Sequence, residues 1–333
     1  MISVTAFAPA TVSNVACGFD VLGFALDSPG DEVTARFLTE EDRASSAPKT
    51  PRGSDAGTRR GVIIESIEGD DGRLPREAAR NTAGVAALTL LTKLGERRSV
   101  GLSIKKGLPL SSGLGGSAAS AAAAVVAVDA LVGGRSSSDT LIACALEGER
   151  LGAGSGHADN VAPCICGGFV LVRRPNPPDI LRLPVPSGLT AVVVHPDLEI
   201  ETARARALLG DTVPLGDAIR QWANMGALVH GLHLGDFAVI GRALEDTIAE
   251  PRRASLVPGL AVIKRAAVDA GALGCSLSGS GPSLFALCAS AAVAERVAKA
   301  MTTAVRAQIG GEPQTYISPI APEGARVLST CNS

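Results

Sequence analysis

The most informative segment of the chain reads Pro109-Leu110-Ser111-Ser112-Gly113-Leu114-Gly115-Gly116-Ser117-Ala118-Ala119. Its glycines permit unusual φ values and let a phosphate approach the backbone closely. A nearly continuous run of Ala and Val follows, which predicts a buried helix as a rigid base for the loop. The free N–H groups and the positive dipole end at a helix start stabilise an anion. Ser117 falls at that start, where its hydroxyl can cap the helix or hold a metal-bound phosphate oxygen.

This segment therefore predicts a phosphate-binding loop, and the alternative is a glycine-rich corner with only a structural role. No Gly-Lys-Ser/Thr ends the loop, so it is not a Walker motif. Its glycine spacing also differs from the Gly-x-Gly-x-x-Gly fingerprint of dinucleotide-binding folds.

Length, composition and charge indicate an ordinary globular protein. The 333 residues suffice for two domains, and 46% are hydrophobic while 19% are charged. The net charge of −2, without a basic tail or helix, gives little support to a nucleic-acid or membrane-surface partner. The seven cysteines are scattered without a Cys-x-x-Cys pair, which indicates small buried thiols in a reducing compartment. No signal peptide or membrane-spanning run is visible. We therefore expect a cytoplasmic protein.

Hydrophobic periodicity predicts strands that alternate with helices. Strands are expected at 4–8, 31–38, 62–68, 100–104, 168–173, 189–194, 274–278, 283–288 and 314–318. Helices are expected at 81–94, from the end of the phosphate loop to about 131, and at 138–151, 201–209, 214–232, 236–247, 259–270 and 291–308. Residues 42–60 have the composition of a solvated loop. The pattern predicts an α+β fold with α/β layers, divided into domains at 1–175 and 176–333.

Three segments together resemble the GHMP kinases, the superfamily of galacto-, homoserine, mevalonate and phosphomevalonate kinases. In chain order they are Pro9-Ala10-Thr11-Val12-Ser13-Asn14-Val15-Ala16-Cys17-Gly18-Phe19-Asp20-Val21-Leu22-Gly23, the phosphate loop at 109–119, and Gly279-Ser280-Gly281-Pro282-Ser283. Each is weak alone, but their order and separations match over almost the whole chain. The resemblance implies an S5 domain 2-like N-terminal domain, a ferredoxin-like C-terminal domain, ATP and substrate between them, and a homodimer.

Further segments resemble the homoserine kinases within that superfamily. They are residues 14–23, His157-Ala158-Asp159-Asn160-Val161-Ala162-Pro163, residues 199–206 and residues 248–253. Two departures stand out: Ala16-Cys17 replaces the usual Gly-Pro, and Gly116 replaces the first of two serines in the phosphate loop. The resemblance implies an ATP-dependent phosphotransferase that acts on L-homoserine in threonine biosynthesis. The alternatives are another GHMP kinase, of the mevalonate or sugar type, and a non-catalytic GHMP-like binding protein.

By this resemblance, the whole loop from Pro109 to Ala119 binds the triphosphate of ATP. Ser117 and Glu149 would hold Mg²⁺, because a hard cation prefers oxygen ligands. Without the resemblance, Glu149 would be taken for a surface salt-bridge residue. Asn81 matches a position near the adenine and could equally serve as a helix N-cap.

The implied substrate carries an ammonium, a carboxylate and an alcohol, and the resemblance assigns a partner to each. Asp20 matches the position for the ammonium. Arg206 and Arg253 match positions for the carboxylate, where a guanidinium can bind two oxygens. At the second position the sequence leaves Arg252 and Arg253 as alternatives. Three further residues would complete the pocket by hydrogen bonds: Asn14, His157 and Thr202.

Asn160 matches a position that is an Asp, thought to act as a base, in sister kinases. An amide does not usefully accept a proton, so we expect no side-chain general base. With a loose transition state the proton of the alcohol can leave late, to phosphate or water. Asn160 would then orient the hydroxyl and form the catalytic set with Glu149 and Ser117. The turn at 278–281 is expected to pack on the phosphate loop rather than to contact a ligand.

Overall fold

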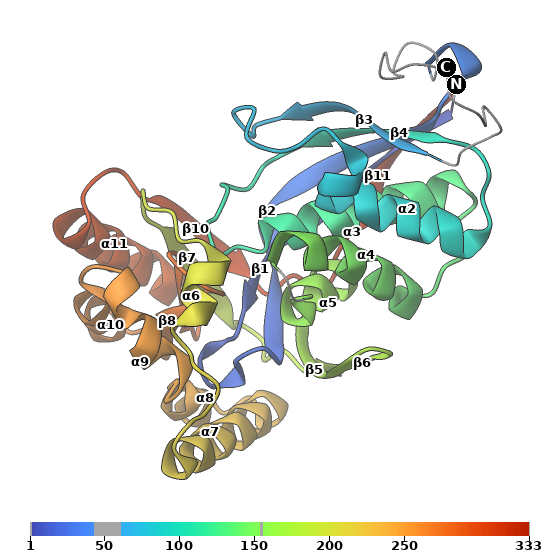
Figure 1. The fold of residues 1–333 in the computed structure, drawn as a ribbon. Helices are drawn as coiled ribbons and strands as arrows, with labels where there is room; N and C mark the ends of the chain where they lie inside the picture. Colours follow the sequence, from blue (N-terminus) through green and yellow to red (C-terminus); the bar gives the residue numbers. More distant parts are fainter. Residues whose placement is uncertain (1, 43–60, 154–155, 333) are drawn as a thin grey trace.

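The computed structural model describes residues 2–42, 61–153 and 156–332. Its larger sheet has seven strands in the described residues, in the order β11-β1-β2-β4-β3, while β5 pairs with β2 and β6 with β5. The strands are β1 (Ile2–Ser13), β2 (Leu22–Phe37), β3 (Val62–Glu68), β4 (Val100–Lys105), β5 (Phe169–Pro175), β6 (Pro178–Leu183) and β11 (Arg326–Asn332). Helices lie against this sheet on one side (Figure 1). They are α2 (Thr82–Leu94), α3 (Gly116–Leu131), α4 (Ser138–Ala153) and α5 (Ala158–Cys166).

Helix α3 is the predicted Ala-rich helix and is buried against β1, β2, α2 and α4. Its small side chains allow neighbours to approach from every direction, which makes it a rigid base for the loop before it. Strands β3 and β4 run parallel and are joined through α2. A parallel pair needs such a crossover helix. This βαβ unit agrees with the expected N-terminal architecture.

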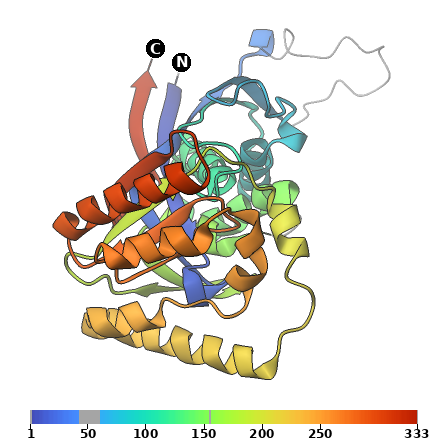
Figure 2. The ribbon, with the colours of Figure 1, turned by 90° about the vertical axis from the view of Figure 1, so that its left-hand side faces the viewer.

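The smaller sheet is antiparallel and has four strands in the described residues, in the order β10-β7-β9-β8. Its strands are β7 (Thr190–His195), β8 (Gly274–Leu277), β9 (Leu284–Cys288) and β10 (Gln314–Pro319). Helices α10 (Leu260–Asp269) and α11 (Ala291–Gln308) pack on it with a core of their own (Figures 1 and 2). The succession of strand, helices, two strands, helix and strand is ferredoxin-like, as predicted.

The remaining helices lie in the chain between β7 and β8. They are α6 (Thr202–Ala207), α7 (Leu215–Leu234), α8 (Phe237–Ala243) and α9 (Ala249–Arg253). Three short 3₁₀ turns complete the described elements: η1 (Ala16–Gly18), η2 (Ala78–Arg80) and η3 (Ala254–Leu256). None of the described helices is both long and apolar enough to cross a membrane.

The two sheets share one hydrophobic core at their junction. Phe24 of β2 packs edge-on against Phe285 of β9, with ring centroids 5.9 Å apart. Phe169 of β5 lies on the other side of Phe24 at 5.3 Å. Aromatic contacts of this kind bury large area in a defined geometry. The residues around the junction are therefore held by packing from both halves.

The chain returns to the first sheet after it has built the second. Strand β11 pairs antiparallel with β1, so that Ile2 lies opposite Asn332, and both chain ends lie together (Figures 1 and 2). Strand β6 also belongs to the first sheet, although it follows residue 176. The division of the chain at 175/176 stays a prediction, and the structure adds that the last strand crosses back over it.

Several elements are longer than the sequence pattern predicted, or were not predicted. Strand β1 extends from the predicted 4–8 to Ser13 because its second half is buried on both faces and shows no alternation. Helix α5 was missed because it contains Pro163, which normally interrupts helices. Strands β6 and β11 and helix α9 were also missed. The predicted loop at 42–60 lies outside the described residues, except for residue 42.

All seven cysteines are free thiols. Five of them are buried, as expected. Cys166 is half-buried and Cys331 is exposed on β11, so the expectation of burial was wrong for these two. Cys331 is exposed because β11 is an edge strand whose residues 326–331 are all exposed to solvent.

Candidate functional site

A cavity of about 440 Å³ lies where the two halves meet, within the usual size range of small-ligand sites. Its wall is built from the end of β1, the phosphate loop, the end of α4, the start of α5, α6, α9 and the turn before β9. All of the sequence-predicted site residues line it except Leu114, Ala118 and Ala119. These three are fully buried and support the loop from behind.

The phosphate loop is held in a conformation that only particular residues permit. Gly113 and Gly115 have φ values of +76° and +68°, in the left-handed region that favours glycine. A Cβ on Gly115 would lie 2.1 Å from the Thr11 hydroxyl oxygen, and one on Gly113 would lie 2.5 Å from the Ser278 carbonyl oxygen. Helix α3 begins at Gly116 without a side-chain cap, so its first amides remain for an anion.

The turn between β8 and β9 packs on this loop, as the sequence predicted. Ser278 Oγ donates to the Gly113 carbonyl oxygen at 2.7 Å, and Ser283 Oγ donates to that of Ser112 at 2.6 Å. The third motif therefore fixes the back of the loop. Gly279 and Ser280 of the same turn also line the cavity, which was not expected.

A buried ion pair that the sequence did not predict holds both ends of the loop. Lys106 contacts the carboxylate of Asp31, and it donates to the Gly116 carbonyl oxygen at 2.7 Å and to Ser120 Oγ at 2.9 Å. Asp31 in turn accepts from the amides of Gly107 and Leu108 at 3.0 and 3.3 Å. The side chains of the pair are 2% and 0% exposed. The charges thus tie β2 and β4 to the first turn of α3.

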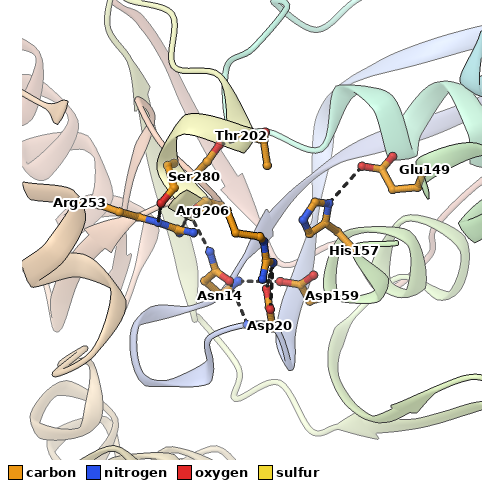
Figure 3. Close-up of polar contacts among 11 residues, drawn as sticks. Asn14, Asp20, Glu149, His157, Asp159, Thr202, Arg206, Arg253 and Ser280 are labelled. Carbon is orange, nitrogen blue, oxygen red and sulfur yellow. Dashed lines mark hydrogen bonds and ion pairs between the residues drawn. The ribbon is translucent and has the colours of Figure 1, made fainter. Parts of the chain in front are cut away.

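Two oxygens in the cavity wall have the chemistry of cation ligands. Ser117 Oγ and Glu149 Oε2 are buried without a hydrogen-bond partner in the described part of the chain. Burying an oxygen without a hydrogen-bond partner costs free energy, and a cation that prefers oxygen ligands would satisfy both atoms. Glu149 Oε1 lies 3.4 Å from His157 Nδ1 (Figure 3). The donor set therefore fits Mg²⁺, with waters and phosphate oxygens as the further ligands.

Charged side chains from both halves meet on the other side of the cavity (Figure 3). Arg206 Nη2 donates to both carboxylate oxygens of Asp20, at 2.7 and 2.9 Å. Asn14 accepts from the Asp20 amide at 3.0 Å and donates to the Gly279 carbonyl oxygen at 2.7 Å. Arg253 donates to the same carbonyl oxygen at 3.1 Å. This network places Arg206 and Arg253 on one wall.

The geometry separates the two arginines that the sequence could not. Arg253 is 3% exposed and lines the cavity. Its burial, and then the charge of Arg206, lower the pKa of its guanidinium. Arg252 does not line the cavity and donates to the Thr212 carbonyl oxygen at 3.0 Å instead.

Asp159 belongs to the site and was not singled out from the sequence. Its Oδ2 accepts from the backbone N–H of Asn14 at 3.1 Å, while its buried Oδ1 has no hydrogen-bond partner in the described residues. Burial, and then the negative charge of Asp20, raise the pKa of Asp159 to about 6. The sequence signal that could have identified Asp159 was its place in the His157-x-Asp159-Asn160 segment. Burial tends to lower the pKa of His157, but its hydrogen bond to the Glu149 carboxylate and the charge of Asp159 raise it overall.

The remaining predicted residues also lie at the cavity. Asn160 Oδ1 accepts from Thr11 Oγ1 at 2.8 Å, which leaves the Nδ2 group to face a ligand. Thr202 Oγ1 lies 3.4 Å from Ser280 Oγ. Asn81 caps α2 by accepting from the Ala83 amide at 3.0 Å, and it lines the cavity too. Both roles considered for Asn81 are thus compatible.

Comparison with known proteins identifies the class that this fold and site represent. The family described as "GHMP kinases N terminal domain" matches residues 81–168, and "GHMP kinases C terminal" matches residues 228–307. The fold is therefore that of a GHMP kinase.

The curated relatives narrow the family further. A homoserine kinase of Chlorobaculum tepidum is 45% identical over 99% of this chain and 99% of its own length. One from Xanthomonas campestris pv. campestris is 41% identical over 97% of this chain and 94% of its own. The crystal structure of a homoserine kinase from Cytophaga hutchinsonii matches with a TM-score of 0.89 and 46% identity, over 98% and 97% of the two chains. The chain belongs to the homoserine kinase family of the GHMP kinases, which confirms the resemblance.

Proposed function

We propose that the protein transfers the γ-phosphoryl group of ATP to the hydroxyl of L-homoserine, forming ADP and O-phospho-L-homoserine, a step of threonine biosynthesis. The observation that carries this proposal is the 45% identity to a homoserine kinase over 99% of the chain. The cavity supports it, because one wall offers backbone amides to a triphosphate and the other offers charges of both signs to an amino acid.

On the nucleotide side, the loop from Pro109 to Ser117 would surround the phosphates and Asn81 would lie near the adenine. Lys106 uses its donors on Asp31, Gly116 and Ser120, so it acts on the phosphates through the loop it holds. The first amides of α3 would face the negative charge, which is where a helix stabilises an anion.

On the substrate side, the carboxylate would bind Arg206 and Arg253, and the ammonium would bind Asp20. Asn14, His157 and Thr202 would complete the substrate pocket by hydrogen bonds, and His157 also contacts Glu149 at 3.4 Å. The two arginines lie at the junction of α6 and α9, so a carboxylate there would be held from two helices.

The chemical step needs positioning and charge stabilisation more than proton transfer. The hydroxyl oxygen forms a bond to the γ-phosphorus while the bond from that phosphorus to the bridging oxygen of ADP breaks. Asn160 orients the substrate hydroxyl, and the proton of that hydroxyl leaves late, to phosphate or water. Mg²⁺ held by Ser117 and Glu149 would neutralise charge on the phosphate oxygens.

A coupled ADP-release assay tests the proposal with homoserine, mevalonate, galactose and shikimate as acceptors. We expect ADP release with homoserine that depends on Mg²⁺ and falls by about 10²-fold or more in Glu149→Gln. This variant is isosteric and also shows that the activity is not from a contaminating kinase. A preference for any of the other three alcohols would overturn the substrate assignment. A homodimer and a cytoplasmic location stay predictions.

A further inference from the structure

The two residues that the proposed function assigns to the ammonium and the carboxylate of the substrate hold each other in this structure. Arg206 Nη2 lies 2.7 and 2.9 Å from the two carboxylate oxygens of Asp20 (Figure 3). Their side chains are 36% and 39% exposed, so a ligand in the cavity can reach both. While Arg206 and Asp20 bind each other, each has fewer groups free to bind the substrate.

Two buried atoms beside this pair have no hydrogen-bond partner in the described residues. One is a donor, Arg206 Nε, and the other is an acceptor, Asp159 Oδ1. A buried donor or acceptor without a partner is unfavourable and indicates a missing ligand group. A carboxylate would satisfy the donor and an ammonium would satisfy the acceptor. These atoms point to a ligand that carries both charges.

The surrounding residues fix the positions of these groups. Asn14 Oδ1 accepts from the backbone amide of Asp20, and the backbone amide of Asn14 donates to Asp159 Oδ2. Arg253 is anchored by the carbonyl oxygens of Ala205 and Gly279. Two carboxylates and two guanidinium groups thus meet at the end of the cavity opposite Glu149 (Figure 3).

We propose that the Asp20–Arg206 ion pair is exchanged for the zwitterionic head group of the substrate, and that this exchange excludes alcohols carrying only one of the two charges. This inference rests on the proposed function. On binding, Arg206 moves from Asp20 to the substrate carboxylate, and the substrate ammonium takes its place between Asp20 and Asp159. One ion pair becomes two, and neither protein charge is left alone.

A hydroxy acid without an amine cannot complete this exchange. Its carboxylate would draw Arg206 away, and Asp20 would then lie beside Asp159 without the guanidinium that now contacts it. An uncompensated charge in a confined site is costly, and a site built to bind a charged group rejects the analogue that lacks it. Selectivity would thus arise from the penalty on the wrong ligand as well as from contacts with the right one.

The test compares homoserine with 4-hydroxybutyrate, which has the same carboxylate and hydroxyl but no amine. The kcat/KM of each is measured for the wild-type enzyme, Asp20→Asn and Asp159→Asn. We expect the wild type to prefer homoserine by at least about 10³-fold. Each variant should reduce that preference by at least about tenfold, because homoserine loses a partner while 4-hydroxybutyrate no longer leaves a charge unpaired.

The variants preserve the local structure. Asp20 has a φ of +59°, a conformation that Asn also tolerates well. Asn in place of Asp159 can still accept from the Asn14 amide. Asp27→Asn removes an equal charge from an exposed position of β2 outside the cavity, and it should leave the preference unchanged.

A crystal structure with homoserine and an ATP analogue gives an independent measurement. We expect Arg206 to have left Asp20 and the ammonium to contact both carboxylates. The inference is wrong if the pair persists beside bound homoserine, or if both variants slow the two alcohols equally. The proposed function would survive that result as long as the wild type phosphorylates homoserine, whereas no turnover of homoserine would overturn the function itself.

Discussion

Asn160 lines the cavity, and its contacts define what it can do. Its Oδ1 accepts from Thr11 Oγ1, which leaves its Nδ2 donor available to a ligand. We expect Asn160→Ala to lower kcat by about 10²-fold while KM changes much less, since a misplaced hydroxyl reacts slowly even when bound. Thr11→Val should produce part of the same loss by releasing the amide.

Steady-state kinetics with saturating ATP measure both constants, and Asn160→Asp serves as the folding control. The alanine variant should melt at a temperature similar to that of the aspartate variant. An unchanged kcat in Asn160→Ala would remove this residue from the mechanism.

Asp159 makes the use of homoserine depend on pH. Burial and the charge of Asp20 raise the pKa of Asp159 from 3.8 to about 6, against the opposing effect of the neighbouring His157. A carboxyl with a raised pKa is neutral below it and ionised above it, and only the ionised form balances an ammonium. We therefore expect kcat/KM for homoserine to rise between about pH 5 and pH 7.

The control for this prediction is Asp159→Asn, because ATP itself titrates in the same range. The rising limb should be weaker in this variant than in the wild type. The unliganded wild type should also lose stability relative to the variant as the pH rises from about 4 to about 6, since folding favours the neutral acid. Parallel profiles for the two proteins would contradict the assignment.

At this scale, the sequence predicted residues whose chemical type was informative within a motif, such as Asp20 and Arg206. It missed Asp31 and Lys106, which are 75 positions apart in the chain and meet only because β2 pairs with β4. Thr11 was quoted within a motif but given no role, because its partner Asn160 lies 149 positions away. Contacts of this kind depend on strand register, which no local pattern encodes.

The phosphate loop contains two adjacent glycines that should respond differently to replacement by alanine. Gly115 has a φ of +68°, and a Cβ there would lie 2.1 Å from Thr11 Oγ1. Gly116 begins α3, and its Cβ would meet nothing closer than 3.5 Å. We expect Gly115→Ala to weaken ATP binding by at least about tenfold and to cost about 1–3 kcal/mol of stability. Gly116→Ala should keep both near the wild-type values.

Isothermal titration with ATP and chemical unfolding measure these two effects. The pair controls for loss of a glycine, because the variants differ by one position. Similar affinity in both variants would mean that the conformation of the loop does not set nucleotide binding.

The ion pair beneath the loop should matter more for stability than its surface neighbour. Asp31→Asn leaves the buried Lys106 without its counter-ion, which should cost about 3–5 kcal/mol of unfolding free energy. The double change Asp31→Asn with Lys106→Met should recover part of that loss. Urea unfolding measures the difference.

Glu32→Gln is the matched control for this prediction. It breaks the adjacent pair with Lys105, whose charged atoms are 3.5 Å apart. The Lys105 and Glu32 side chains are 63% and 37% exposed, so the loss should be at most about 1 kcal/mol. Equal losses for Asp31→Asn and Glu32→Gln would show that the buried pair has no special role.

Helices and strands were predictable from the sequence where one face is buried and the other is exposed to solvent. Helix α11, with its buried stripe and a Ser290 cap, was found at its correct bounds. Strand β11 was not, because most of its residues are exposed and the strand it pairs with in the described residues, β1, lies more than 300 residues earlier. Its formation depends on the edge that β1 offers and not on its own pattern.

Two features connect the halves of the molecule. One is the core around Phe24 and Phe285, and the other is the returning strand β11. Strand β11 covers the outer edge of β1 and also contacts α3. Since β1 leads to Thr11 and Asn14, and α3 begins at the phosphate loop, the last strand supports both walls of the cavity from a distance. The site is therefore built by the packing of the entire chain.

Deletion of residues 326–333 should expose the outer edge of β1 and separate stability from chemistry. An unpaired strand edge invites pairing with another chain, so we expect a lower melting temperature and association beyond that of the full chain. Strand β1 keeps its pairing with β2, and so activity at low temperature should stay within about threefold. Light scattering, thermal melts and the coupled assay measure the three effects. Deletion of 331–333 alone removes Cys331 but leaves most of the pairing, so it should behave like the full chain. A truncated protein that melts and elutes like the full chain would show that the two halves hold together without the returning strand.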